Sequence, residues 1–179
     1  MASHALLLRG INVGRARQLP MAELRDLLTE RGYDDVRTYV RSGNVVLGTR
    51  QGEAALRSTV EKAIDARFGM PVPVIVRTRA QITEVIDANP LPHGVDEPAK
   101  LFVAFLDAPL PAGAGDAVDP DDYLPDEFRV NGAEVYFRCP NGLSNSTFTP
   151  AFWKALGVRA NSTVRNWNTV LMLQRMLDG

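Results

Sequence analysis

Hydrophobic and polar positions follow two different periods along the first 79 residues. Residues 36–41 alternate apolar and polar side chains, which is typical of a half-buried strand. Residues 3–9, 45–48 and 72–78 are short apolar runs that indicate buried strands. Two intervening segments, 20–31 and 52–68, repeat apolar residues every three or four positions, which predicts helices. The predicted order is therefore strand, helix, strand, strand, helix, strand.

This order is that of the split βαβ, or ferredoxin-like, arrangement, and right-handed crossovers leave few alternatives to it. The expected strand order is 4-1-3-2. The two central strands would be 5–9 and 45–48, and both are apolar on both faces, although the helices of this arrangement cover only one. We therefore expect the rest of the chain to cover the second face.

The pattern is less regular after residue 79. Asn-Gly at 131–132 lies between two apolar runs and fits a type I′ turn, so a β-hairpin is the firmest prediction in this part. The other predicted elements are a short helix near 82–86, a proline-rich loop at 89–98, a buried strand at 100–107, a Pro/Gly/Asp-rich segment at 108–122, and helices near 149–156 and 165–177. The predicted fold class is α+β: a ferredoxin-like βαββαβ half at 1–79, and a smaller α+β half at 80–179 that packs against the sheet of the first.

The composition excludes several classes of protein. The chain has 179 residues, of which 45% are hydrophobic, so it has enough apolar surface for a packed core and a disordered chain is excluded. The longest wholly apolar run, 101–106, is far shorter than the ~20 residues that span a bilayer, and the first residues lack the pattern of a secretory signal. We therefore expect a cytoplasmic protein without a membrane partner.

One cysteine and two histidines offer little for metal or nucleophilic chemistry. Cys139 has no second cysteine for an internal disulfide, and His4 and His93 are too far apart in sequence to form a recognisable zinc motif. Neither histidine has a context that places a serine or cysteine beside it. We predict no metal and no cofactor. The aspartates between residues 116 and 126 lack the glycine and terminal glutamate of a calcium loop, so we interpret them as a solvated face.

Charge is distributed unevenly, although the net charge is −1. Residues 1–79 carry 13 basic and 8 acidic side chains, whereas residues 84–134 carry 2 basic and 12 acidic ones. A basic half indicates an anionic partner such as a phosphate, a nucleotide or a nucleic acid. The alternative is that the acidic segment faces the basic half within one molecule, and both interpretations stay open.

Four blocks of sequence carry a family resemblance. They are Leu8-Arg9-Gly10-Ile11-Asn12-Val13-Gly14, Pro20-Met21 with Leu24, Thr38-Tyr39 with Arg41-Ser42-Gly43-Asn44-Val45, and Arg165-Asn166-Trp167-Asn168-Thr169-Val170. With these blocks the chain resembles the bacterial family DUF1697, a domain of unknown function. The resemblance implies a two-part α+β fold with a ferredoxin-like first half, and it implies no activity. Relatives often carry Arg or Lys in the loop where this chain has Ser144-Asn145-Ser146-Thr147, so the chain departs from them there.

The strand ends of the first half are expected to bring candidate binding residues together. The first and second strands of a ferredoxin-like sheet run parallel with the third between them, so their C-terminal ends lie about 10 Å apart at one edge. No Ser, Thr, Asp or Asn immediately precedes Pro20, so the amides of the helix that begins there need another acceptor. An anion held by arginines would supply it. The candidate ligand-binding residues at this edge are Arg9, Asn12, Arg15, Arg17, Arg41, Ser42 and Asn44.

Arg165 and Asn168 form a second candidate group, because they belong to an unusual polar block at the head of an apolar helix. They would line a pocket between the two halves, where ligand sites tend to occur. The structural alternative is that Asn166 caps the helix, Arg165 pairs with an acid and Trp167 is part of the core. For the first group, the alternative is that glycines shape a tight turn, the arginines are solvated and water satisfies the helix end.

Hypotheses from several functional classes are consistent with these residues. The leading hypothesis is the binding of a small ligand that bears a phosphate or a carboxylate. An enzyme of unknown reaction could use the same pocket, with arginine stabilising developing negative charge. A third hypothesis is an interaction module that binds a partner, or a second copy as a homodimer, through the exposed strand of Arg37 and Tyr39. Nucleic acid is a weakly supported partner, because the first and third strands lack the aromatic residues on which RNA-recognition modules stack bases.

Overall fold

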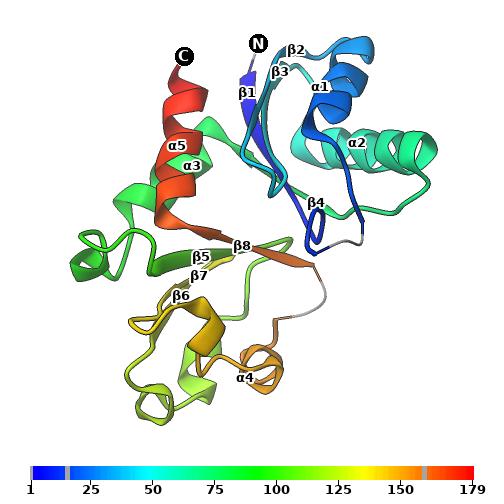
Figure 1. The fold of residues 1–179 in the computed structure, drawn as a ribbon. Coiled ribbons are helices and arrows are strands. Elements are labelled where there is room, and N and C mark those ends of the chain that lie inside the picture. Colours follow the sequence, from blue (N-terminus) through cyan, green and yellow to red (C-terminus); the bar gives the residue numbers. More distant parts are fainter. Residues whose placement is uncertain (1, 15–16, 159–160) are drawn as a thin grey trace. The chain divides into compact units, whose positions relative to one another are not determined.

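The computed structural model describes residues 2–14, 17–158 and 161–179 and contains two four-stranded antiparallel sheets with five α-helices among these residues (Figure 1). The chain divides into two compact units. Unit 1 comprises Met1–Glu84 and Met172–Gly179, and unit 2 comprises Val85–Leu171. Residues 80–84 and 172–179, which the sequence pattern assigns to the second half, group with unit 1 by their contacts. No α-helix in the described part is both long and apolar enough to cross a membrane.

Unit 1 has the element order that the sequence pattern predicts. Its elements are β1 (Ala2–Leu8), α1 (Met21–Glu30), β2 (Asp34–Tyr39), β3 (Asn44–Thr49), α2 (Glu53–Phe68), β4 (Val74–Thr78) and the beginning of α3 (Arg79–Asp87). The strand order is β2-β3-β1-β4, and each pair of neighbours is antiparallel. Counted from the other edge, this order is β4-β1-β3-β2.

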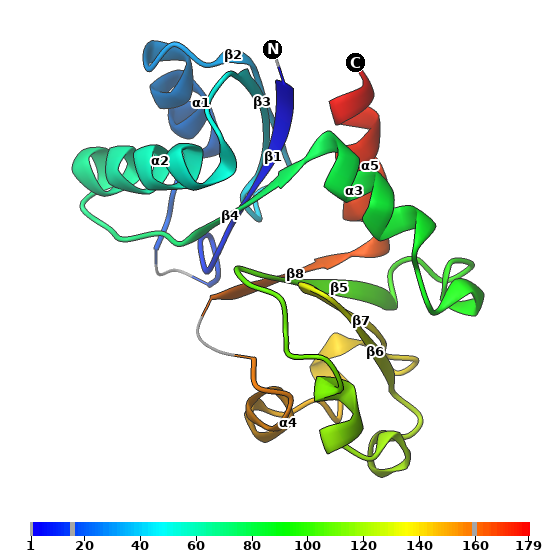
Figure 2. The same cartoon turned by 180° about the vertical axis from the view of Figure 1, so that it is seen from behind.

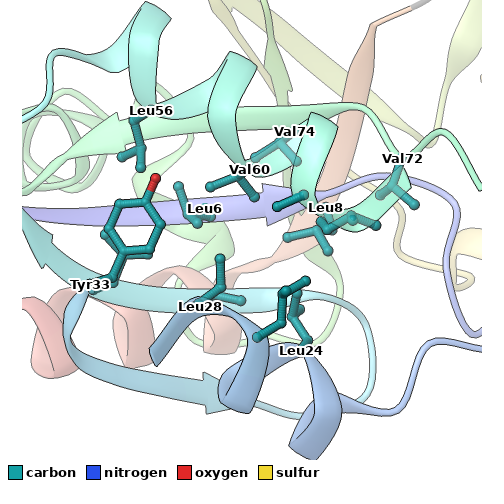
Figure 3. Packing of buried hydrophobic residues seen from close by; sticks show 14 of the residues in the cluster. Leu6, Leu8, Leu24, Leu28, Tyr33, Leu56, Val60, Val72 and Val74 are labelled. Atoms are coloured by element: carbon teal, nitrogen blue, oxygen red, sulfur yellow. The ribbon is translucent and has the colours of Figure 1, made fainter. Parts of the chain in front are cut away.

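The core of unit 1 lies between its sheet and helices α1 and α2, which cover the same face (Figure 2). Figure 3 shows Leu6 and Leu8 of β1 between Leu24 of α1 and Val60 of α2. The alternate residues of β1, such as Leu7, are also fully buried, which confirms that this strand is covered on both faces.

The C-terminal part of α5 (Trp167–Asp178) contributes to unit 1. Met176 accepts a hydrogen bond of 2.5 Å at its carbonyl oxygen from the Arg37 guanidinium on β2. Helix α5 also lies alongside α3, where Thr83 Oγ1 donates to Gln174 Oε1 at 3.0 Å and Arg79 pairs with Asp178 at 2.7 Å (Figures 1 and 2). Residues from the end of the chain therefore complete the unit formed by its beginning.

Unit 2 contains a sheet of the same order. Its strands are β5 (Leu101–Leu106), β6 (Glu127–Asn131), β7 (Glu134–Arg138) and β8 (Ser162–Asn166), arranged β6-β7-β5-β8 with antiparallel neighbours. The predicted hairpin is confirmed as β6–β7, but its turn is not the expected type I′ turn at 131–132. Asn131 pairs with Glu134, so the loop residues are 132 and 133, and of these only Gly132 has a positive φ, of +61°. The remaining elements are α4 (Pro150–Ala155) and the 3₁₀ segments Pro92–Gly94, Ala114–Ala117, Pro120–Tyr123 and Leu143–Asn145.

Strand β8 corrects one sequence prediction. Arg165 and Asn166 were expected to head a helix at 165–177, but they end a strand and the helix begins at Trp167. The sequence pattern did not predict this strand, because its two buried positions are the polar residues Thr163 and Arg165 where a strand usually has apolar ones. The expected cap at Asn166 is confirmed, since its Oδ1 accepts from the Thr169 amide at 3.0 Å.

The two units repeat one topology. Strands β5, β6, β7 and β8 correspond in order and pairing to β1, β2, β3 and β4, and a helix follows directly after both β4 and β8. Arg77 and Arg165 occupy the same position, one residue before the end of their strands. Both are buried, and both donate to the carbonyl oxygen of the preceding valine, at 3.0 Å and 2.8 Å. The sequence shows no corresponding repeat.

Candidate functional site

We use the name "arginine loops" for the described residues 9–14, 17–20 and 40–44 of unit 1. The side chain of Asn12 joins the two loops: its Nδ2 donates to the carbonyl oxygens of Leu19 at 2.9 Å and Arg41 at 2.7 Å. Its Oδ1 accepts from the Leu19 amide at 2.8 Å. Asn12 has a φ of +55°, a left-handed conformation that asparagine tolerates better than most residues. The expectation that these two loops are neighbours is confirmed.

Gly43 fixes how closely the loops approach. The Leu8 amide donates to the Gly43 carbonyl oxygen at 2.8 Å, and Gly43 has a φ of +82°. A Cβ at this position would lie 2.7 Å from Leu8 Cβ and 2.9 Å from Ile11 Cδ1. Only glycine meets both requirements, the positive φ and the lack of space.

The arginines of these loops differ in exposure and contacts. Arg41 is exposed and donates weakly to Gln18 Oε1 at 3.4 Å. Arg17 is exposed, has a φ of +52° and donates to the carbonyl oxygen of Pro71. Arg9 is half-buried and its amide donates to the Pro73 carbonyl oxygen at 3.0 Å. Arg15 lies outside the described residues. Three cationic side chains therefore belong to the described part of the loops.

Asn44 and Ser42 close the reversal between β2 and β3. Asn44 is fully buried, and its Nδ2 donates to the Tyr39 carbonyl oxygen at 3.1 Å and to Ser42 Oγ at 2.9 Å. These bonds, like those of Asn12, shape the backbone. The candidate residues thus fall into two groups, asparagines that position the loops and arginines that carry the charge.

Helix α1 begins beside these loops without a side-chain cap. Pro20 occupies the N-cap position in an extended conformation, and its side chain makes no capping hydrogen bond, as the sequence predicts. The acidic residue of the first turn is the exposed Glu23, which complements the helix dipole. The first-turn amides are therefore available to an acceptor from outside the chain.

Arg165 and Asn168 belong to unit 2, and their place in a pocket between the two halves stays a prediction. Arg165 is buried, and desolvation lowers the pKa of its guanidinium to about 10. Its Nη1 donates to Thr163 Oγ1 at 2.7 Å. Asn168 is exposed in the first turn of α5.

Three other side chains of unit 2, those of Asp126, Cys139 and His93, make their contacts within that unit. Asp126, expected on a solvated face, is buried, which corrects that prediction: its Oδ2 accepts from Ser146 Oγ at 2.9 Å and from the Thr147 amide at 2.7 Å. Burial raises the pKa of the Cys139 thiol to about 11, so it is a poor nucleophile at neutral pH. His93 is exposed and pairs with Glu127 at 3.0 Å. The described residues contain no group of three or more His, Cys, Asp or Glu side chains that could hold a metal ion.

Two open hollows lie in unit 2, with volumes of about 550 Å³ and 630 Å³. They lie on either side of the loop that follows β5, and residues 110–114 line both. The arginine loops line neither of them. The candidate anion site is thus a surface cluster of loops. The sequence pattern did not predict the hollows, whose shared lining, residues 110–114, is leucine, proline, alanine and glycine.

Comparison with known proteins gives a family and a fold. None of the curated proteins compared matches the chain. The solved structure of the conserved bacterial protein SP0830 from Streptococcus pneumoniae is similar, with a TM-score of 0.74 and 20% sequence identity over 98% of each chain, which shows a common fold. The family model described as "Protein of unknown function (DUF1697)" matches residues 1–136. The chain therefore belongs to the DUF1697 family.

Proposed function

We propose that the arginine loops of unit 1 bind a small anion that bears a phosphate or a carboxylate. The observation that supports this most directly is the contact of Asn12 with Leu19 and Arg41, because it holds two loops together that both carry arginine. Guanidinium groups offer planar pairs of donors that match the oxygens of phosphate and carboxylate.

The beginning of α1 adds to the same potential. Amides at the first turn of a helix carry partial positive charge, and those of α1 have no side-chain cap. An anion beside Pro20 would accept from them while the arginines neutralise its charge. Glu23 opposes such an anion, so its removal is expected to tighten binding.

The proposal assigns the sheet of unit 1 to the ferredoxin-like class, on its strand order and its antiparallel pairing. In this class the ends of β1 and β2 lie at one edge of the sheet. The binding loops then follow from the topology, because residues 9–20 continue β1 and residues 40–43 continue β2.

Anion binding by the arginine loops is better supported than the pairing of β2 with a strand of a partner protein or a second copy. The pairing of β2 with β3 is irregular between Asp34 and Arg37, and Asp35 and Val40 have φ values of +47° and +48°. A bulged strand with left-handed residues at its two ends is a poor template for a further strand. Arg37 is also engaged, by Asp35 at 2.8 Å and by the Met176 carbonyl oxygen.

A thermal-shift titration with inorganic phosphate, pyrophosphate and citrate tests the proposal. The wild type is compared with Arg9→Ala/Arg41→Ala, and with Arg31→Ala/Arg50→Ala as a control of equal charge. Arg31 and Arg50 are exposed residues of unit 1 outside the arginine loops. At ten times Kd, a bound anion stabilises the fold by about 1.4 kcal/mol, or roughly 3–6 °C in Tm. We expect the control to keep this response and the loop variant to lose it. No response to any of the three anions in the wild type, or equal responses in both variants, would contradict the proposal.

A further inference from the structure

Two exposed valines belong to the arginine loops. Val13 is 71% exposed and Val40 is 51% exposed, whereas the other large hydrophobic residues that are exposed in the described part of the chain belong to unit 2. Val13 directly follows Asn12, and Val40 directly precedes Arg41, whose carbonyl oxygen accepts from Asn12 Nδ2 at 2.7 Å. The two valines therefore flank the contact that joins the loops.

The backbone of Val40 has a conformation that its side chain disfavours. Its φ of +48° lies in the left-handed region, where glycine and asparagine are usual and a β-branched residue is an outlier. Burial does not compensate for this conformation, because about half of the residue is exposed. Residues in unfavourable conformations cluster at ligand sites, so the conformation of Val40 agrees with a role in binding.

A guanidinium group lies beside the loop that carries Val13. Gln18 Nε2 donates at 2.9 Å to the carbonyl oxygen of Gly14, the residue that follows Val13. Gln18 Oε1 accepts from Arg41 Nη2 at 3.4 Å. The head group of Arg41 and the backbone next to Val13 thus contact one side chain, and the loops combine a cation with exposed apolar groups.

Three segments that build this surface contain no Asp or Glu. They are residues 1–22, 36–52 and 66–82. The third segment adjoins the loops, because the Arg17 guanidinium donates to the carbonyl oxygen of Pro71. Residues 15 and 16, which lie outside the described part, are arginine and alanine, so they add no negative charge. The potential of the surface therefore favours an anion.

The acidic residues that flank these segments lie outside the arginine loops. Asp35 pairs with Arg37 at 2.8 Å, and Glu61 accepts from the Val74 amide at 2.9 Å. Glu23 is exposed in the first turn of α1, where water and salt screen its charge. None of these carboxylates interrupts the two loops in sequence.

We propose that the ligand of the arginine loops is an organic anion, a phosphate monoester or a carboxylate whose apolar body covers Val13 and Val40. This inference rests on the proposed function, because the arginines hold the anionic group. Contact with the valines removes apolar surface of both partners from water. A membrane surface fits less well, since two valine side chains provide less apolar area than one myristoyl chain, which alone binds a bilayer only marginally.

Two pairs of anions, titrated into the full chain by calorimetry, test the inference: methyl phosphate with butyl phosphate, and acetate with pentanoate. The members of a pair carry the same anionic group and differ by three methylenes. A methylene that is half-buried against the valines contributes about a factor of two in affinity. We therefore expect the longer member of the pair that binds to have an affinity about eightfold higher.

Variants separate the apolar contact from the charge. Val13→Ser/Val40→Asn removes the apolar side chains and keeps the arginines, and asparagine tolerates a positive φ, so the variant should keep the circular dichroism spectrum of the wild type. It should bind the short anion as the wild type does and lose the preference for the long one. Val95→Ser, a control at a valine of unit 2 that is 42% exposed, should keep the preference. Arg9→Ala/Arg41→Ala should lose the binding of both anions.

The inference and the proposed function fail in different ways. If the wild type binds none of the four anions, the proposed function is wrong and the inference falls with it. If it binds both members of a pair equally well, or if the double valine variant keeps the preference, the anion site stands and the apolar contact is overturned. Sedimentation with phosphatidylcholine vesicles that contain phosphatidic acid distinguishes a lipid surface from a free ligand. We expect the protein to stay in the supernatant, and co-sedimentation without a preference for the longer anions would overturn the inference in favour of a membrane.

Discussion

Replacement of Asn12 by alanine tests the geometry on which the anion site depends. The side chain makes three hydrogen bonds, of 2.7, 2.8 and 2.9 Å, to the backbone of Leu19 and Arg41. Each such bond contributes about 1 kcal/mol net. Alanine at a φ near +55° adds a conformational cost of about 1 kcal/mol. We expect Asn12→Ala to lower the free energy of unfolding by about 3–4 kcal/mol.

Urea denaturation followed by circular dichroism measures this loss, and hydrogen exchange at the Leu19 amide reports the local opening. Asn89→Ala is the matched control. Asn89 also bonds to backbone groups, but only to those of Leu91, two residues further on. Its replacement should cost less than about 1 kcal/mol, because no distant segments are joined. If Asn12→Ala costs no more than the control and Leu19 stays protected, the contact does not hold the loops together.

Three further predictions concern other parts of the fold. Gly43→Ala should destabilise the protein by about 2–4 kcal/mol, because the new Cβ would lie 2.7 Å from Leu8 Cβ. Gly10→Ala should cost about 1 kcal/mol, because a Cβ at residue 10 would have no atom within 4 Å. Equal losses of stability in urea denaturation would show that the loops can move apart. Asp126→Ala should cost about 3 kcal/mol in the same assay, since it leaves Ser146 and the Thr147 amide without their acceptor, and a loss below 1 kcal/mol would speak against that role. The pKa of Cys139 rises on folding from 9.0 to about 11, so the folded state binds its proton more tightly, and the stability that this thiol contributes should be present below pH 9 and lost as the pH rises to about 11. Relative to Cys139→Ala, the wild type should therefore lose about 1–2 kcal/mol between pH 8.5 and 11, and parallel pH profiles of the two proteins would refute this.

Patterns that depend on local periodicity were sufficient to predict the order of helices and strands in unit 1 and the β6–β7 hairpin. The alternation in residues 36–41 and the glycine between two apolar runs at 132 are properties of a few neighbouring residues. The turn type was predicted wrongly, because the pairing of Asn131 with Glu134 moves the loop by one residue. The sequence pattern did not predict strand β8, because its buried positions are threonine and arginine rather than apolar residues. A buried arginine needs hydrogen-bond partners, and the local sequence does not show whether the fold supplies them.

For the candidate site, the sequence predicted which loops meet but not what each residue does there. Asn12 and Asn44 were assigned to ligand binding, and their side chains instead bond to backbone and serine groups of the loops themselves. Asparagine tolerates a positive φ better than most residues, so its position between Gly10 and Gly14 is the signal that could have indicated a positioning role for Asn12. The burial of Asp126 depends on residues 20 positions further on and has no local signal.

The placement of Met172–Gly179 in unit 1 has a consequence for the order in which the protein forms on the ribosome. Translation releases β1 to β4 long before it releases the end of α5, so nascent unit 1 lacks the segment that contacts Arg37 and Arg79 until residues 172–179 have been made. A chain that stops at residue 171 would thus contain all of unit 2 and only part of unit 1. Proteolytic sensitivity of the amino-terminal segment should therefore persist until residues 172–179 have been made.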